Sequence, residues 1–96
     1  MMAASAAEVA LDQPGRFLSQ LCRHFAHRLP VTEDGARGSI AFAGGTCTLR
    51  AAPGALHLRL EAEDAATRAR LEEVVASHLL RFAFRDPPEV RWVPGA

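Results

Sequence analysis

The strongest constraint on the fold of this chain is the strict alternation of apolar and polar residues between positions 56 and 61. Leucines at 56, 58 and 60 alternate with His57, Arg59 and Glu61. A period of two is typical of a β-strand with one buried and one wet face. Antiparallel sheets allow this arrangement, because only one of their faces has to be covered. The stretch therefore predicts a one-sided sheet, and the rest of the chain must supply the layer that covers the leucines.

Weaker alternation recurs along the chain and predicts five further strands. They are expected at 7–11, 29–33, 39–42, 46–51 and 89–93. Asp34-Gly35, Gly44-Gly45 and Pro53-Gly54 are turn signals between them. Residues 29 to 61 therefore read as a four-strand meander.

Two amphipathic helices are expected to cover the sheet. The first is predicted from Gln13 to Arg28, with Asp12 as its N-cap and Pro14 in its first turn. Its apolar stripe comprises Leu18, Leu21, Cys22, Phe25 and Leu29. The second is predicted to open at Asp64, and its stripe comprises Leu71, Val74, Val75, His78, Leu79 and Phe82.

The predicted order is strand, helix, four strands, helix, strand. Ninety-six residues are enough for one core and too few for two, so a single domain is expected over residues 1–96. The predicted fold class is α+β: a two-layer sandwich of β-α-β4-α-β order, with a largely antiparallel sheet and both helices packed on one face.

Composition narrows the function classes. The net charge is zero, with eleven arginines and no lysine, and no basic stripe of the kind that nucleic-acid binders carry is evident. No segment has the apolar length of a membrane span or the pattern of a signal peptide. We therefore expect a cytoplasmic protein with no nucleic-acid or membrane partner, in which both cysteines are reduced thiols.

Three histidines are candidate ligands for an iron or zinc ion. His24 and His27 are three residues apart on the predicted first helix and can chelate together. His78 lies inside the apolar stripe of the second helix, so Cys22, Cys47 and His78 form an alternative inward-facing set. The competing interpretation is that these residues are buried packing groups beside a solvated His27, because a zinc site needs three or four protein ligands.

The polar face of the sheet holds the second group of candidates. His57 and Arg59 point away from the leucines, and Arg50 and Arg91 are expected to join them. Arg59 and Arg91 are the candidate contacts for an anionic group or for a second copy of the protein. The alternative is an ordinary solvated surface.

Several segments together resemble a family of short bacterial proteins catalogued as domain of unknown function two-two-one-eight. The resemblance lies in Leu21-Cys22-Arg23-His24-Phe25-Ala26-His27, of pattern LCxHFxH, and in residues 76–85, of pattern ASHLxRFAFR. Some members are joined to, or encoded near, siderophore-interacting flavin reductases. The resemblance thus implies a role in iron or siderophore metabolism, with such a reductase as the expected partner. The element order also resembles the TATA-binding-protein-like arrangement, a likeness of fold that implies no function.

Three functional hypotheses follow. The first is a small binding or accessory protein, linked to iron or siderophore metabolism. The second is a homodimer formed through the open sheet face, and the third is a small enzyme with a buried histidine as general base. The chain has no glycine-rich phosphate loop, no CxxC and no HExxH motif, so the sequence favours binding over catalysis.

Overall fold

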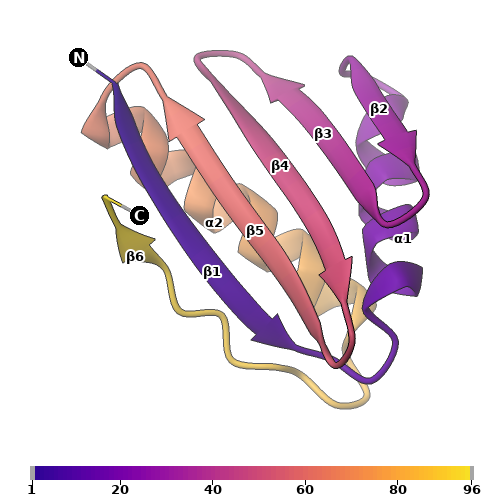
Figure 1. Ribbon diagram of the computed structural model, residues 1–96. Helices are drawn as coiled ribbons and strands as arrows, with labels where there is room; N and C mark the ends of the chain where they lie inside the picture. The colour runs from indigo at the N-terminus through magenta and orange to yellow at the C-terminus, as the bar shows by residue number, and fades with distance from the viewer. Residues whose placement is uncertain (1, 96) are drawn as a thin grey trace.

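The strand that carries the alternating leucines, β5 (Ala55–Ala62), lies inside a six-stranded sheet between β4 and β1 in the computed structural model (Figure 1). The structure describes residues 2–95; Met1 and Ala96, the ends of the predicted domain, lie outside the described residues. The other elements are β1 (Ala3–Ala10), α1 (Pro14–Ala26), β2 (Val31–Asp34), β3 (Arg37–Phe42), β4 (Gly45–Ala52), α2 (Ala65–Phe82) and β6 (Val93–Pro94).

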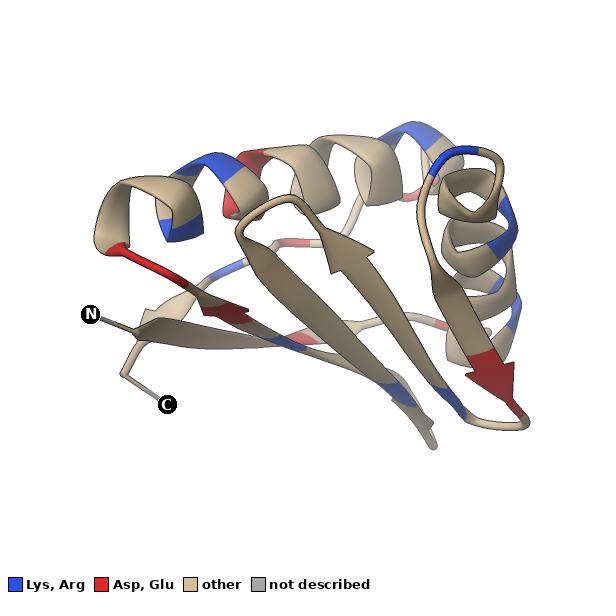
Figure 2. Ribbon diagram, turned by 90° about the horizontal axis from the view of Figure 1, so that it is seen from above, with Lys and Arg blue, Asp and Glu red and all other residues tan. Residues whose placement is uncertain are grey.

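The sheet has the order β2-β3-β4-β5-β1-β6, and every neighbouring pair is antiparallel. Both helices lie on the same side of it (Figure 2). Helix α1 packs against β2, β3 and β4, whereas α2 packs mainly against β5 and β1. The predicted two-layer α+β architecture is therefore confirmed, including the β-α-β4-α-β order and the placement of both helices.

The core lies between the helices and the leucine face of the sheet. It contains Leu56, Leu58 and Leu60 from β5, each at most 1% exposed. The buried helix residues are Leu18, Leu21, Cys22 and Phe25 from α1 and Leu71, Val75 and Leu79 from α2. These are members of the predicted stripes, because residues three and four apart share one helix face.

Helix α1 begins later than predicted, and its predicted cap is wrong. The N-cap is Gln13, with φ −132° and ψ 73°, and no side chain caps this end of the helix. Pro14 explains the shift, because a proline forces the residue before it out of the helical region. By contrast, Asp64 caps α2 as predicted: its side chain accepts a hydrogen bond of 2.7 Å from the backbone N–H of Thr67.

The two terminal strands also differ from the prediction. β1 begins at Ala3 and pairs with β5 over eight positions, four residues before the predicted start. β6 comprises only Val93 and Pro94, which pair with Ala6 and Ser5 of β1, so residues 89–92 of the predicted strand lie outside the sheet. Residues 90–92 nevertheless alternate as predicted, although they form no strand. Val90 and Trp92 pack on the core, whereas Arg91 between them is exposed.

A shift of one residue in the predicted Gly44-Gly45 hairpin has a packing cause. The two-residue loop is Ala43-Gly44, and Gly45 is the first residue of β4. A Cβ atom at Gly45 would lie 2.7 Å from Leu71 Cδ1 of α2 and equally close to the backbone carbonyl oxygen of Glu61 in β5, so both neighbours require a glycine at this position. Gly38 in β3 likewise leaves room for α1, since a Cβ atom there would lie 2.6 Å from Cys22 Sγ.

Gly38→Ala is expected to destabilise the protein by about 1–3 kcal/mol, because the added methyl group overpacks the contact with the Cys22 thiol. Gly15→Ala is the matched control: nothing lies near its Cβ position in the first turn of α1, so stability should be unchanged or raised by up to about 1 kcal/mol. Urea unfolding measures both. The double variant Gly38→Ala/Cys22→Ala should recover part of the loss, and equal effects of the two glycine substitutions would contradict this packing.

Candidate functional site

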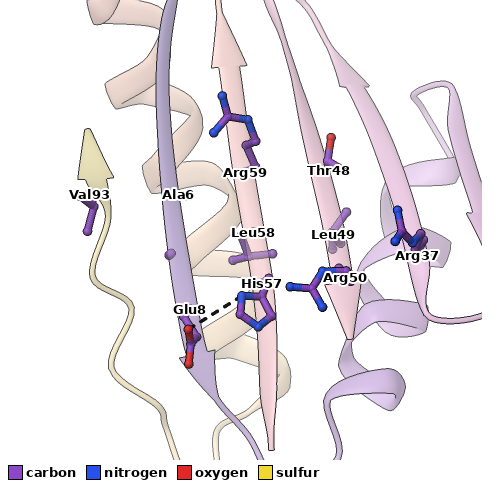
Figure 3. Close-up of a pocket in the computed structure, with 11 residues that line it drawn as sticks. Ala6, Glu8, Arg37, Thr48, Leu49, Arg50, His57, Leu58, Arg59 and Val93 are labelled. Carbon is purple, nitrogen blue, oxygen red and sulfur yellow. Dashed lines mark ion pairs between the residues drawn. The ribbon is translucent and has the colours of Figure 1, made fainter. Parts of the chain in front are cut away.

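A groove on the open face of the sheet is the best candidate for a binding site (Figure 3). Its volume is about 530 Å³, within the range of small-molecule sites. The polar side chains that line it are Glu8, Arg37, Thr48, Arg50, His57 and Arg59, and its floor is the exposed surface of β1, β3, β4 and β5. The site thus stands on four hydrogen-bonded strands rather than on loops.

Strand register sets four of these side chains in one row across the sheet. Arg37 is opposite Arg50, Arg50 is opposite His57, and His57 is opposite Glu8. Directly opposite residues in antiparallel strands share a face and have Cα atoms about 5 Å apart. Figure 3 shows the Arg50 side chain reaching toward His57, with Glu8 on the far side of the imidazole. We call this set, Arg37, Arg50, His57 and Glu8, the arginine row.

Two positive charges stand next to each other in the arginine row, between an acid at each end: Asp34, opposite Arg37, and Glu8, opposite His57. The carboxylate of Glu8 lies 3.9 Å from His57 Nδ1, at the β1 end of the row. Neither Arg37 nor Arg50 forms an ion pair with any residue in 2–95, although the two face each other directly. Like charges in opposite positions destabilise a strand pair. Two guanidinium groups on adjacent strands can instead converge on one oxyanion, which each can hold through two N–H donors.

The structure separates the two arginines that the sequence suggested as ligand contacts. Arg59 lines the groove, as expected. Arg91 does not: it lies before β6, its side chain is 77% exposed, and it stands 3.4 Å from the carboxylate of Glu89. Arg37 was missed because its strand was predicted to begin at Ser39. Gly38 occupies a buried position of the strand, but a glycine does not count as apolar when alternation is read from the sequence, so the predicted strand started after it.

The candidate histidines lie elsewhere, at the contact between the two helices. The rings of His24 and His78 are 4.8 Å apart, and Phe25 and Phe82 surround them with centroids 4.9 Å from His78 and 5.6 Å from His24 respectively. His78 is half-buried, with Nδ1 2.6 Å from the carbonyl oxygen of Val74. Since a carbonyl only accepts, Nδ1 carries the proton in the neutral ring and Nε2 keeps its lone pair.

His24 and His78 are therefore brought together, whereas His27 is exposed after the end of α1. Within residues 2–95, no three His, Cys, Asp or Glu side chains are grouped closely enough to hold one metal ion. Iron or zinc binding by His24, His27 and His78 thus remains a prediction, and the geometry favours His24 and His78 as its ligand pair.

The environment of His24 lowers its pKa below the ordinary value of 6.5, through partial desolvation and then through the nearby His78, Arg81 and His27. The unfolded chain therefore takes up this proton at a higher pH than the native protein. Above pH 6.5 the His24 imidazole has no effect on the pH dependence of the free energy of unfolding. As the pH falls below 6.5, the free energy of unfolding decreases, because the unfolded chain binds the proton more tightly. An NMR titration should place the His24 midpoint below 6.5, and His24→Gln should reduce the fall in Tm between pH 7 and pH 5. A midpoint at or above 6.5 would contradict this environment.

Zinc titration tests the histidine pair directly. For protein purified without a histidine tag, added zinc should shift the ring resonances of His24 and His78 before those of His57, and His78→Gln should abolish the effect. His57→Gln is the matched control, since it removes an imidazole far from the pair. Absence of any spectral change with zinc or ferric ions, together with less than about a tenth of an equivalent of metal by elemental analysis, contradicts the metal hypothesis.

Both cysteines are buried, as the apolar-stripe interpretation predicted. Burial, with a smaller contribution from Glu33, raises the pKa of the Cys22 thiol to about 11. Burial and the neighbouring Cys22 raise the pKa of Cys47 to about 12. The thiolate is the reactive form, so neither thiol is poised for nucleophilic or redox chemistry at neutral pH.

A second cavity, of about 670 Å³, lies between the first half of α1 and the segment that follows α2. Its charged lining residues are Asp12, Arg16, Arg85 and Asp86, two acids and two bases. This balance gives it no preference for ligands of either charge. Neither cavity is lined by His24 or His78, so the general-base hypothesis gains no support from them.

Residues 6–93 match the family described as "Uncharacterized protein conserved in bacteria (DUF2218)", and the chain belongs to that family. A solved structure, the NMR structure of PA4090 from Pseudomonas aeruginosa, is similar to this protein with a TM-score of 0.79 and 30% sequence identity. The similarity covers 97% of this chain and 96% of that chain.

The family resemblance seen in the sequence is thereby confirmed. No curated protein matches the chain significantly. Among the described residues, neither helix combines the length and the apolar character needed to cross a bilayer.

Proposed function

We propose that this protein is a small cytoplasmic binding or accessory module that holds an anionic ligand in the groove of its open sheet face. The observation that carries the proposal is the placement of Arg37 directly opposite Arg50, with no acid in 2–95 paired to either. Two unit charges about 4 Å apart in water repel each other by about 1 kcal/mol, which is an upper limit for the guanidinium groups of two facing residues. A bound oxyanion turns that repulsion into two charge-assisted interactions.

A second copy of the protein is the competing occupant of this face. In a symmetric dimer each residue contacts a different residue of the partner unless it lies at the twofold axis. The Arg37 and Arg50 side chains of the two copies would therefore be brought together only by an axis that passes beside them. Glu8 at one end of the arginine row and Asp34, opposite Arg37, at the other are the acids that such a dimer could place against them.

Within this proposal, we expect the ligand to belong to iron or siderophore metabolism and a siderophore-interacting reductase to be the partner. The support is the family resemblance together with charge: deprotonated catechol and carboxylate groups make ferric chelates anionic, which the arginine row complements. Guanidinium groups suit such oxygen-rich ligands, because they present several donors in a fixed plane.

The test is a phosphate titration followed by ¹⁵N NMR and thermal unfolding at low ionic strength. Inorganic phosphate should shift the amide signals of β3, β4 and β5, with a Kd of order 1 mM, and raise the free energy of unfolding by about 1.4 kcal/mol at ten times Kd. Arg50→Gln and Arg37→Gln should each weaken binding at least about tenfold, equivalent to about 1.4 kcal/mol.

Each of these variants should also be more stable than the wild type, by up to about 1 kcal/mol without phosphate, because the repulsion is gone. Arg91→Gln is the matched control: it removes the same charge from a surface outside the groove and should leave binding unchanged. If Arg91→Gln weakens binding as much as Arg50→Gln does, the anion is not held in the groove.

The diamagnetic gallium tris-catecholate anion tests the iron hypothesis separately. Tighter binding than phosphate, with the same arginine dependence, supports it, whereas weaker binding contradicts the chelate as ligand.

A further inference from the structure

One end of the groove is basic and the other is apolar, so an elongated ligand can lie in it in one preferred orientation. One row along from the arginine row, Thr48 is opposite Arg59, Arg59 is opposite Ala6, and Ala6 is opposite Val93. Val93 is 54% exposed, one of the few large apolar side chains in 2–95 that face water. Figure 3 shows it on β6, across β1 from the basic side chains. The apolar part of the lining thus consists of Ala6 on β1 and Val93 on β6, next to Arg59 on β5 and Glu8 on β1, whereas Arg37 and Arg50 stand at β3 and β4.

The separation of the two ends sets a length. From β4, which carries Arg50, to β6, which carries Val93, there are three strand spacings, or about 14 Å. An inorganic oxyanion spans only the basic end. A ligand that uses both ends needs an acidic head and an apolar body that together reach about 10–14 Å.

Glu8 places a negative charge near the apolar end of the groove. Its side chain is 71% exposed, lines the groove from β1 and stands 3.9 Å from His57 Nδ1. A second acidic group on the ligand, carried toward β1 and β6, would approach this carboxylate, which repels it, and also Arg59, which is opposite Ala6 and attracts it. Glu8 thus weakens the binding of ligands with an acid at each end, and removal of its charge should strengthen it.

From these three observations we propose that the groove takes an amphipathic monoanion: one acidic head between Arg37 and Arg50, and an apolar, preferably flat body over Ala6 and Val93. This ligand class rests on the anion-binding part of the proposed function. It competes with the multiply charged ferric chelate, and the gallium tris-catecholate titration distinguishes the two. The apolar body buries the exposed Val93 side chain, so the two ends contribute separately, by charge and by the hydrophobic effect.

Three carboxylates of graded chemistry test this ligand class: butanoate, 4-phenylbutanoate and adipate, titrated by ¹⁵N NMR. Phenylbutanoate should bind at least about fivefold more tightly than butanoate, because its ring covers the apolar end. Val93→Thr keeps the shape of the side chain on an exposed edge strand, and it should remove that fivefold advantage without changing butanoate affinity. Adipate should bind no better than butanoate to the wild type and should gain affinity in Glu8→Gln.

The outcomes separate the two proposals. If butanoate and phenylbutanoate bind equally well and both depend on Arg50, the amphipathic ligand class is wrong and the anion site stands. If no carboxylate or phosphate binds, the anion site itself is wrong. If light scattering shows a dimer without ligand that Val93→Thr dissociates, the apolar end is a contact between copies, and the ligand class is again wrong.

Discussion

The burial of the β5 leucines beneath two helices is the interaction on which the rest of this structure depends. Leu56, Leu58 and Leu60 are almost completely buried, and each contributes roughly 1.5–3 kcal/mol relative to exposure. Because the side chains of a strand alternate, covering this face directs the residues between them to the other face. Both helices lie on the leucine side, so the opposite side of the sheet is left to polar residues and to solvent.

That asymmetry allows the open face to carry side chains that would be costly elsewhere. Repulsion between two facing arginines in water is at most about 1 kcal/mol, which is less than the burial of one leucine in the core contributes. The scaffold can hold two facing arginines in fixed register because hydrogen bonds on both sides fix β4 in the sheet. A site built on strands in this way keeps its geometry without a ligand, and little ordering entropy is then lost on binding.

The close approach of the helices depends on two glycines in the sheet. Gly38 makes room for the Cys22 thiol of α1, and Gly45 makes room for Leu71 of α2. Both lie in strands, where glycine is otherwise unfavourable, so their role is one of space rather than of turn geometry. The same two residues misled the sequence interpretation, since Gly38 masked the start of β3 and Gly45 was taken as part of a hairpin loop.

Local patterns in the sequence were sufficient for the strand alternation of β5, the helical stripes, the Asp64 cap and the order of elements, because each depends on residues a few positions apart. They were insufficient for Ala3–Ala6, which pair with β5, and for the short β6, which pairs with β1 at Val93 and Pro94, because both depend on which distant strand lies alongside.

The candidate site divides in the same way. The alternation in β5 was enough to predict that Arg59 lies on the open face of the sheet. The apolar stripes of the two helices predicted in part that His24 and His78 lie near each other. The pairing of Arg37 with Arg50 and the apolar end at Val93 were decided by cross-strand register. Arg91 is absent from the groove because it precedes β6, where its side chain is exposed beside Glu89. Register joins residues far apart in the chain, and only the folded sheet fixes which of them stand opposite each other.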